Sequence, residues 1–201
     1  GRRLSAQDLH AAGDETYGSY SYTYDDSWNL TQKVDPKSQT INYTYDDINR
    51  PLTEDYTGQA GTEVAYTYDS CTQGKGRLCT ASSTAESTAY LYNALGQTIT
   101  STTTVNSVAY ATSYTYDRQG NQLTITNPDS SIVKYTYNNA GQIETVQRKE
   151  STDGSFIYVV TNFDYSPIGK VTIQEYANGL TTTNTYDPTK LYRLTKKITT
   201  T

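Results

Sequence analysis

The chain has 201 residues, of which 34% are hydrophobic and 18% charged, with a net charge of -5 and an isoelectric point near 4.8. So few apolar residues argue against a conventional aliphatic core, while the modest charge and 12% aromatic content argue against disorder. The sequence has no basic run and no long apolar stretch, so we expect neither a nucleic-acid partner nor a membrane span.

The residues that replace aliphatic side chains favour β-structure. The chain contains 21 tyrosines, and threonine occupies many alternate positions. Both residue types suit the pleated, half-buried surface of a strand. The composition therefore predicts an all-β fold.

An internal repeat organises nearly the whole chain. Its unit is an aromatic residue, any residue, a second tyrosine and then Asp or Asn. The clearest copies carry the tyrosine pairs Tyr22 and Tyr24, Tyr43 and Tyr45, Tyr66 and Tyr68, Tyr90 and Tyr92, Tyr114 and Tyr116, and Tyr135 and Tyr137. Two weaker copies end at Tyr165 and Tyr186. The second tyrosine, called the anchor tyrosine below, recurs after 21, 23, 24, 24, 21, 28 and 21 residues, which indicates a repeat architecture.

The first 21 residues are predicted to be a partial or degenerate repeat that begins in the middle of a hairpin. Gly1 to Leu4 resemble the exit of a later turn, Gly120 to Leu123. Residues 5–19 hold no clear anchor, so we expect a return strand and a loop there. His10 is the only histidine, and no local nucleophile or orienting acid accompanies it. We interpret it as an exposed loop residue.

Each anchor tyrosine is followed by the signature of a tight turn. An Asp, Asn or Ser stands at the first turn position and can cap a backbone amide, while a glycine at the fourth position can adopt a positive φ. The turn glycines are Gly96, Gly120, Gly141 and Gly169. A second apolar strand follows, so each repeat reads as a β-hairpin. Trp28, Asn49 and Leu191 stand where a glycine is expected, and we predict looser or longer turns there.

Residues 22–201 are predicted to form about eight such hairpins in tandem. In residues 108–116 the tyrosines alternate with threonine, serine and alanine. One face of the sheet should therefore carry tyrosine rings and the other should carry hydroxyl ladders. The resulting fold class is an all-β, tandem antiparallel hairpin array that forms a curved or spiral sheet.

Cys71 and Cys79 are the only cysteines, and they flank an insertion in the third hairpin. A disulfide across the neck of this hairpin would fit an oxidising, extracellular setting. Two unpaired thiols are the alternative. A zinc site would need more ligands than these cysteines and the distant His10 supply.

Recurring turn acids and tyrosines allow two further interpretations. The acids could bind calcium or, in pairs, attack a glycosidic bond, but a residue required by every turn is better explained by capping. They are Asp25, Asp46, Asp69, Asp117 and Asp187. The tyrosines could stack on sugars if their rings were exposed. We interpret them instead as the main apolar mass of the wall, and we predict no catalytic residue, metal or cofactor.

The combination Tyr-x-Tyr-Asp-x-x-Gly-Arg/Asn/Gln-Leu/Ile, repeated every twenty-odd residues over about 22–194, resembles the rearrangement-hot-spot (RHS) or YD-repeat family. The best copies span 114–123, 135–143 and 90–99. The resemblance implies a spiral antiparallel sheet that closes into a hollow shell. Such shells occur in large bacterial secreted or surface proteins and in toxin complexes, where they enclose a C-terminal toxic domain, and animal teneurins carry a related barrel.

The functional prediction is thus a non-catalytic structural segment of a bacterial secreted or cell-surface repeat protein that encloses a toxin or effector. The absence of methionine, an initiator included, predicts that the chain is part of a longer array. Its partners would be the flanking repeats and the cargo domain of its own polypeptide. Two alternatives stay open: an adhesive repeat that binds carbohydrate, and a filament that assembles through open strand edges.

Overall fold

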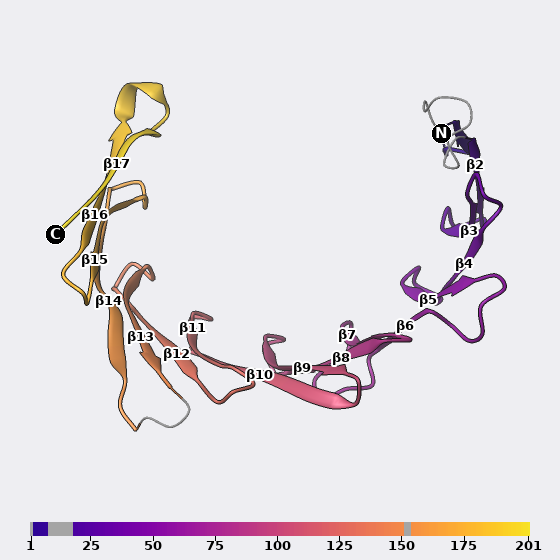
Figure 1. Ribbon diagram of the computed structural model, residues 1–201, viewed down its shortest axis with the longest axis horizontal. Coiled ribbons are helices and arrows are strands. Elements are labelled where there is room, and N and C mark those ends of the chain that lie inside the picture. Colours follow the sequence, from indigo (N-terminus) through magenta and orange to yellow (C-terminus); the bar gives the residue numbers. More distant parts are fainter. Residues whose placement is uncertain (1, 8–17, 151–153) are drawn as a thin grey trace. The chain divides into compact units, whose positions relative to one another are not determined.

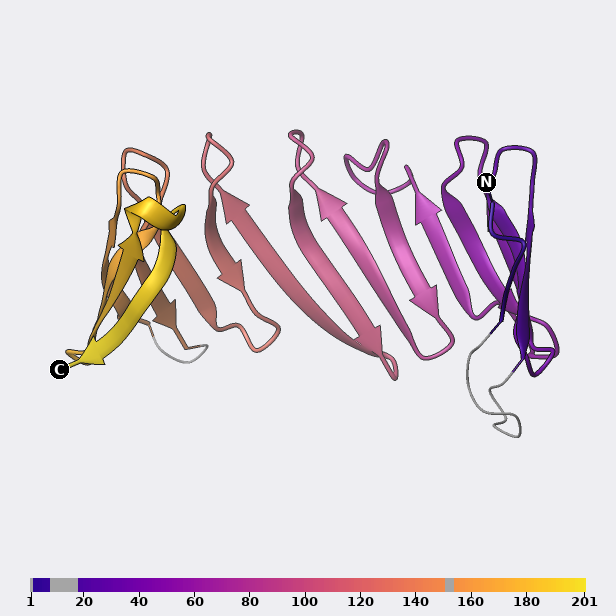
Figure 2. The same ribbon diagram turned by 90° about the horizontal axis from the view of Figure 1, so that it is seen from above.

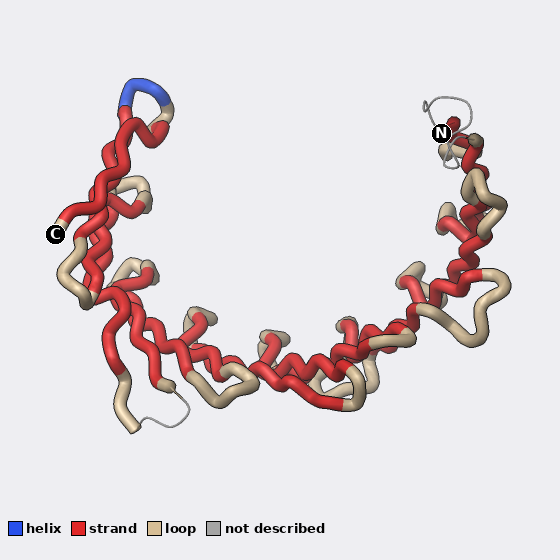
Figure 3. The backbone as a smooth tube through the Cα atoms, viewed as in Figure 1, coloured by secondary structure: helices blue, strands red, loops and turns tan. Residues whose placement is uncertain are grey.

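The computed structural model describes residues 2–7, 18–150 and 154–201, and these form seventeen strands and one short 3-10 helix, η1 (Pro188–Lys190) (Figures 1 and 3). The chain divides into two units, Gly1–Tyr110 and Ala111–Thr201, with the boundary inside β10 (Val108–Tyr116). Within each unit, strands that follow one another in the sequence pair antiparallel. The predicted all-β array of antiparallel hairpins is confirmed.

The described residues of the first unit form nine complete strands. They are β1 (Ser5–Gln7), β2 (Ser19–Tyr24), β3 (Leu30–Val34), β4 (Thr40–Tyr45), β5 (Pro51–Tyr56), β6 (Val64–Tyr68), β7 (Leu78–Ser83), β8 (Glu86–Tyr92) and β9 (Thr98–Val105). β1 pairs with β2 through Ser5 and Ser21. The predicted loop that carries His10 lies outside the described residues.

The second unit contains the end of β10 and seven further strands. They are β11 (Gln122–Thr126), β12 (Ile132–Tyr137), β13 (Ile143–Lys149), β14 (Ile157–Tyr165), β15 (Val171–Tyr176), β16 (Thr181–Asp187) and β17 (Arg193–Thr200). In each unit the turns after the anchor tyrosines lie along one long edge of the sheet, and the other fully described connections lie along the opposite edge (Figure 2).

The anchor tyrosines mark strand ends, as the repeat predicts. Seven strands end at their anchor tyrosine, and β16 ends one residue beyond Tyr186. Every hairpin also has a register shift at this point. In the β4–β5 pair, for example, Thr44 is opposite Thr53 while Tyr45 is opposite Pro51, which leaves Leu52 as an extra residue. A β-bulge therefore lies on the strand that follows each anchor turn, and the sequence pattern alone did not reveal it.

The four turn glycines adopt the positive φ that the turn chemistry predicts. Their φ angles lie between 73° and 93°, and in each turn the glycine N–H donates to the carbonyl of the first turn residue. The amides of Trp28 and Asn49 make the same bond at 3.1 and 3.0 Å, with φ of 75° and 65°. The prediction of looser turns at these two residues was wrong, because the capping acid imposes the turn even without glycine.

The last anchor turn is longer, as expected. η1 replaces the four-residue turn, and both Leu191 and Tyr192 adopt positive φ before β17 begins. Asp187 caps η1 by accepting a hydrogen bond from the amide of Thr189 at 2.8 Å. Among the described residues no helix has the length and apolar character of a bilayer span.

The sheet lacks a conventional core, as the composition predicts. Within the described residues only Gly74, Cys79, Val160 and Thr182 are buried, the last three at 2%, 4% and 2% exposure. Threonine pairs bridge the strands of several hairpins, with Oγ1 atoms 2.6 Å apart in Thr44–Thr53 and in Thr67–Thr80. A single-layer sheet of this kind depends on side-chain contacts between neighbouring strands rather than on an enclosed apolar centre.

Candidate functional site: the seam between hairpins

Strands pair over a longer stretch within a hairpin than between hairpins. β8 pairs with β9 along its whole length, from Glu86 to Tyr92, whereas β7 pairs with β8 only through residues 80–82 and 87–89. The same short ladder joins β3 to β4 and β11 to β12, always at the end remote from the anchor turn. We call the junction between the second strand of one hairpin and the first strand of the next, such as β7 and β8, a seam, and the half of it nearer the anchor turns its anchor half. Because the ladder does not reach the anchor half, other contacts must close it.

The anchor tyrosines provide these contacts. The hydroxyl of Tyr45 donates to the carbonyl of Leu30 at 3.0 Å, and that of Tyr137 donates to the carbonyl of Gln122 at 2.7 Å. In each case the acceptor is the first residue of the second strand of the preceding hairpin. Equivalent bonds join Tyr68 to Pro51, Tyr92 to Leu78, Tyr165 to Ile143, and Tyr186 to Val171, and Tyr24 donates likewise to Arg3.

These anchor tyrosines are half-buried, and the burial affects the pKa of their hydroxyls. Burial raises the pKa of Tyr45, Tyr92 and Tyr137. The half-burial of the rings and the use of the hydroxyls as donors accord with the interpretation of the anchor tyrosines as part of the wall. The first tyrosine of each motif instead pairs inside its own hairpin, as Tyr43 does with Glu54 and Tyr135 with Val146.

The turn acids cap the anchor turns. Oδ1 of Asp117 accepts hydrogen bonds from the amides of Gln119 and Asn121, both at 2.9 Å. Asn138 makes the same pair of bonds in its turn, at 2.9 and 3.0 Å. The bonds from Asn121 lower the pKa of Asp117. Among the described residues no group of three or more acids, cysteines or histidines could hold a metal ion.

Acid should weaken the turns, because their carboxylates are stabilised in the folded state. Asp69, Asp117 and Asp187 all have a lowered pKa, chiefly through side-chain hydrogen bonds from Arg50, Asn121 and Thr189. A carboxyl with a lowered folded-state pKa contributes stability that is complete above its unfolded pKa and is lost as the pH falls through the folded pKa. We expect the free energy of unfolding to decline once the pH falls below 3.8, the ordinary Asp value.

Urea denaturation between pH 5 and about 2 would measure this decline. Asp117→Asn should reduce the acid-induced loss, because asparagine caps the turn at Asn138 without titrating. The matched control is Asp26→Asn, since the Asp26 side chain makes no hydrogen bond in the described part of the chain. An acid response that is identical in the wild type and in Asp117→Asn would contradict the capping role.

The residue that follows the turn exit reaches across the seam. Arg50 donates to Oδ2 of Asp46 in its own turn and to Oδ2 of Asp69 in the next, both at 2.6 Å, and lies 4.3 Å from the Tyr68 ring centroid. Lys170 lies 5.3 Å from the ring centroid of Tyr186, the next anchor. The cations and amides after the turns thus brace one hairpin against the next.

The sequence marks this contact by a polar residue directly after the turn exit, although the motif alone does not show which neighbour that residue reaches. The position after the turn exit is Arg, Asn, Gln or Lys in seven hairpins, as in Asn29, Arg50, Arg77, Gln97, Asn121, Gln142 and Lys170. Nδ2 of Asn29, for example, donates to Oδ1 of Asn49 in the next turn at 2.7 Å. Which neighbour each of these side chains reaches depends on the packing of successive hairpins.

The two cysteines are bonded to each other in the structure. Their Cα atoms are 5.4 Å apart, and Cys79 occupies the bulge position opposite residues 67 and 68. The bond closes the loop that replaces the short anchor turn in the β6–β7 hairpin. It also accounts for the burial of Cys79 in a sheet that buries little else.

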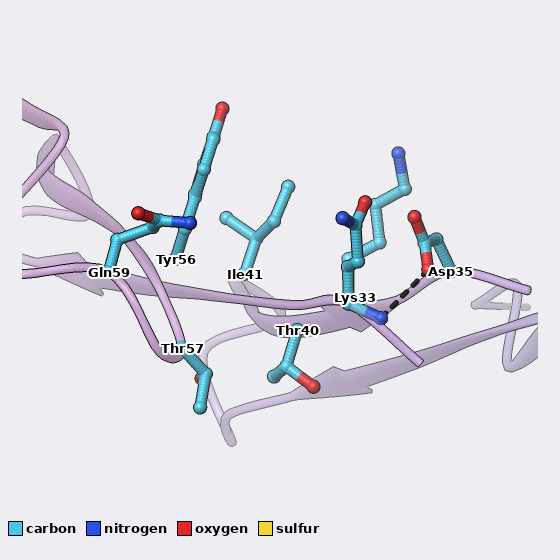
Figure 4. A pocket seen from close by; sticks show the side chains of 8 residues that line it. Lys33, Asp35, Thr40, Ile41, Tyr56, Thr57 and Gln59 are labelled. Atoms are coloured by element: carbon cyan, nitrogen blue, oxygen red, sulfur yellow. Dashed lines mark hydrogen bonds between the residues drawn. The ribbon is translucent and has the colours of Figure 1, made fainter. Parts of the chain in front are cut away.

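A shallow pocket of about 290 Å³ lies in the first unit near the turn between β3 and β4. Figure 4 shows Lys33, Ile41 and Tyr56 on one side of the sheet and Thr40 and Thr57 on the other. Asp35, which also lines the pocket, accepts hydrogen bonds from the amides of Lys37 and Gln39 at 2.9 and 2.8 Å. Its carboxylate therefore caps the turn between β3 and β4.

Comparison with known proteins supports the repeat assignment. Residues 92–132 and 116–153 match the family model RHS Repeat. No curated protein sequence matches the chain. The crystal structure of TcdB2-TccC3 superimposes with a TM-score of 0.86 at 16% identity, covering 100% of this chain and 11% of that one.

Two related structures also superimpose on this chain. The Photorhabdus luminescens Tc holotoxin pore with the mutation TccC3-D651A has a TM-score of 0.82 at 16% identity, covering 99% of this chain and 10% of that one. TcdB2-TccC3-Cdc42 has a TM-score of 0.80 at 16% identity, covering 90% of this chain and 10% of that one. This chain thus spans about a tenth of the length of these structures, and the likeness concerns the fold. Residues 92–153 thus match the RHS Repeat family model, and the tyrosine motif and bulged hairpins on both sides of this segment resemble the same repeat.

Proposed function

We propose that this chain is a non-catalytic wall segment of a bacterial secreted or surface protein, and that the wall encloses a C-terminal toxin or effector domain. The observation that carries the proposal is the repeated tyrosine contact across the seams. Anchor tyrosines in both units are hydrogen-bonded to the preceding hairpin by the same contact, as in Tyr68 to Pro51 and Tyr165 to Ile143. A wall built from such units can be extended without a new kind of contact.

The chemistry of the polar residues favours the same conclusion. The turn acids are engaged as caps and the anchor hydroxyls as donors, so the recurring polar groups serve the sheet. The likeness to TcdB2-TccC3 supports a shell, because that chain is about ten times longer and contains the same fold. Flanking repeats and the enclosed domain of the same polypeptide are the partners that this function requires.

Enclosure can be tested by limited proteolysis of the polypeptide that carries this chain. If the wall encloses a domain, that domain should resist protease in the intact protein at least about tenfold longer than it does when expressed alone, because protection follows the rarity of opening. Weakening one seam with Tyr68→Ala should shorten the protection.

The matched control is Tyr158→Ala, which removes an exposed ring from β14 without touching an anchor contact. It should leave the protection unchanged. Equal rates of digestion for the free domain and for the intact protein would contradict enclosure, whatever the seam variants do.

A further inference from the structure

The loop at 69–79 in the β6–β7 hairpin contacts the hairpins on both sides. Toward the preceding hairpin, Oδ2 of Asp69 accepts the hydrogen bond from Arg50 at 2.6 Å. Toward the following hairpin, the carbonyl of Thr72 accepts a bond from the amide of Tyr92 at 3.3 Å, and the carbonyl of Leu78 accepts one from its hydroxyl at 2.6 Å. The loop therefore lies where three hairpins meet.

The contact with the β8–β9 hairpin continues to its anchor turn. The Arg77 guanidinium lies 5.6 Å from the ring centroid of Tyr92, and a side chain on Gly96 would overlap it. The ladder between β7 and β8 ends at residues 80 and 89. Beyond that point the anchor half of this seam is held by Tyr92 against the loop.

The disulfide holds the loop in the shape that makes these contacts. The amide of Cys71 lies 2.9 Å from Sγ of Cys79, and the amide of Gly74 donates to the carbonyl of Cys71 at 2.9 Å. The carbonyl of Gly74 accepts a bond from the amide of Arg77 at 2.8 Å. The segment that presents Thr72 and Arg77 to Tyr92 is thus folded directly over the two sulfurs.

We propose that the Cys71–Cys79 bond is a redox latch for the seam between the β6–β7 and β8–β9 hairpins. Reduction by a small dithiol frees the loop, and the seam then opens more often at its anchor half. The latch goes beyond enclosure and does not depend on it, because it requires only contacts within this chain. A reducing, thiol-rich compartment would therefore weaken the seam between these two hairpins.

The chemistry is thiol–disulfide exchange. A thiolate of the dithiol attacks Sγ of Cys71, which is half-buried, rather than Sγ of Cys79, which is 2% exposed. The Cys71–Cys79 bond breaks and Cys79 leaves as a thiolate that takes up a proton. The second thiol of the reagent then displaces Cys71, so the two cysteines gain two electrons and the reagent ends as a cyclic disulfide.

Hydrogen exchange measured by mass spectrometry on the whole chain tests the latch. In the oxidised protein the Tyr92 amide should be protected, and dithiothreitol should raise exchange in 70–79 and 90–97 by about tenfold, the order expected for loss of one hydrogen bond. Peptides from 132–149 should not change. The double variant Cys71→Ser and Cys79→Ser should show the raised exchange with or without dithiothreitol.

Arg77→Gln supplies a test that leaves the disulfide intact. It should raise exchange at 90–97 in the oxidised protein, because the guanidinium no longer lies on Tyr92. Three results would overturn the latch: free thiols in the protein before reductant is added, unchanged exchange at Tyr92 after both thiols are shown to be free, or an equal rise in 132–149, which would mean general unfolding.

Discussion

Replacing Tyr137 by alanine is expected to lower the free energy of unfolding by about 2–3 kcal/mol, the range for removing a large, partly buried aromatic side chain. The ring fills the anchor half of the seam, and the hydroxyl donates to the carbonyl of Gln122 at 2.7 Å. Tyr137→Phe keeps the ring and loses only this bond, so it should cost about 1 kcal/mol. Urea denaturation followed by tyrosine fluorescence measures both.

The control for this prediction is Tyr158→Ala. Tyr158 is 50% exposed and lies in β14 opposite Gln147, away from any anchor turn. Its replacement should cost less than about 1 kcal/mol, as is usual for exposed positions. If Tyr137→Ala and Tyr158→Ala were equally destabilising, the anchor tyrosines would have no special part in joining hairpins.

Replacing Gly74 by alanine is expected to destabilise the chain by about 2 kcal/mol, the usual cost of forcing an extra methyl group into a filled site. A Cβ at this position would lie 2.7 Å from Sγ of Cys79 and 2.9 Å from the carbonyl oxygen of Cys71, and would also overlap Sγ of Cys71. The backbone here is closed around the disulfide, so little can move aside. Thermal or urea unfolding of the oxidised protein measures the loss.

Gly76→Ala is the matched control within the same loop. Gly76 has a φ of 76°, and nothing lies within 4 Å of a Cβ built there. Its replacement therefore measures only the backbone strain of a positive φ, about 1 kcal/mol. The close approach of Gly74 to the sulfurs would be disproved if alanine were tolerated better at 74 than at 76.

Together these variants separate two sources of stability in a sheet without a core. Within a hairpin the strands are held by long ladders and by capped turns, and these contacts span few residues. Between hairpins the ladders are short, so the anchor tyrosines and the side chains after the turns carry the junction. Loss of a contact between hairpins should open only the seam that it closes, because each repeat contacts chiefly its neighbours.

The sequence by itself determined where the hairpins lie. Strand ends at Tyr68 and Tyr116 and positive φ at Gly120 and Gly141 followed from the pattern of aromatics, turn acids and glycines. These features are local, because a capping carboxylate and the amides it binds lie within about five residues of each other. The same locality explains why Trp28 adopts the turn conformation that a glycine was expected to require.

Only the tertiary structure decided how one hairpin meets the next. That the Tyr45 hydroxyl bonds to the carbonyl of Leu30, and that Arg50 joins Asp46 to Asp69, depends on the register between hairpins. Within each hairpin the bulge on the strand after the anchor turn adds one residue, and no local residue preference marks it in the sequence. Contacts between residues about twenty positions apart are set by this geometry, and it places the loop closed by the two cysteines against Tyr92.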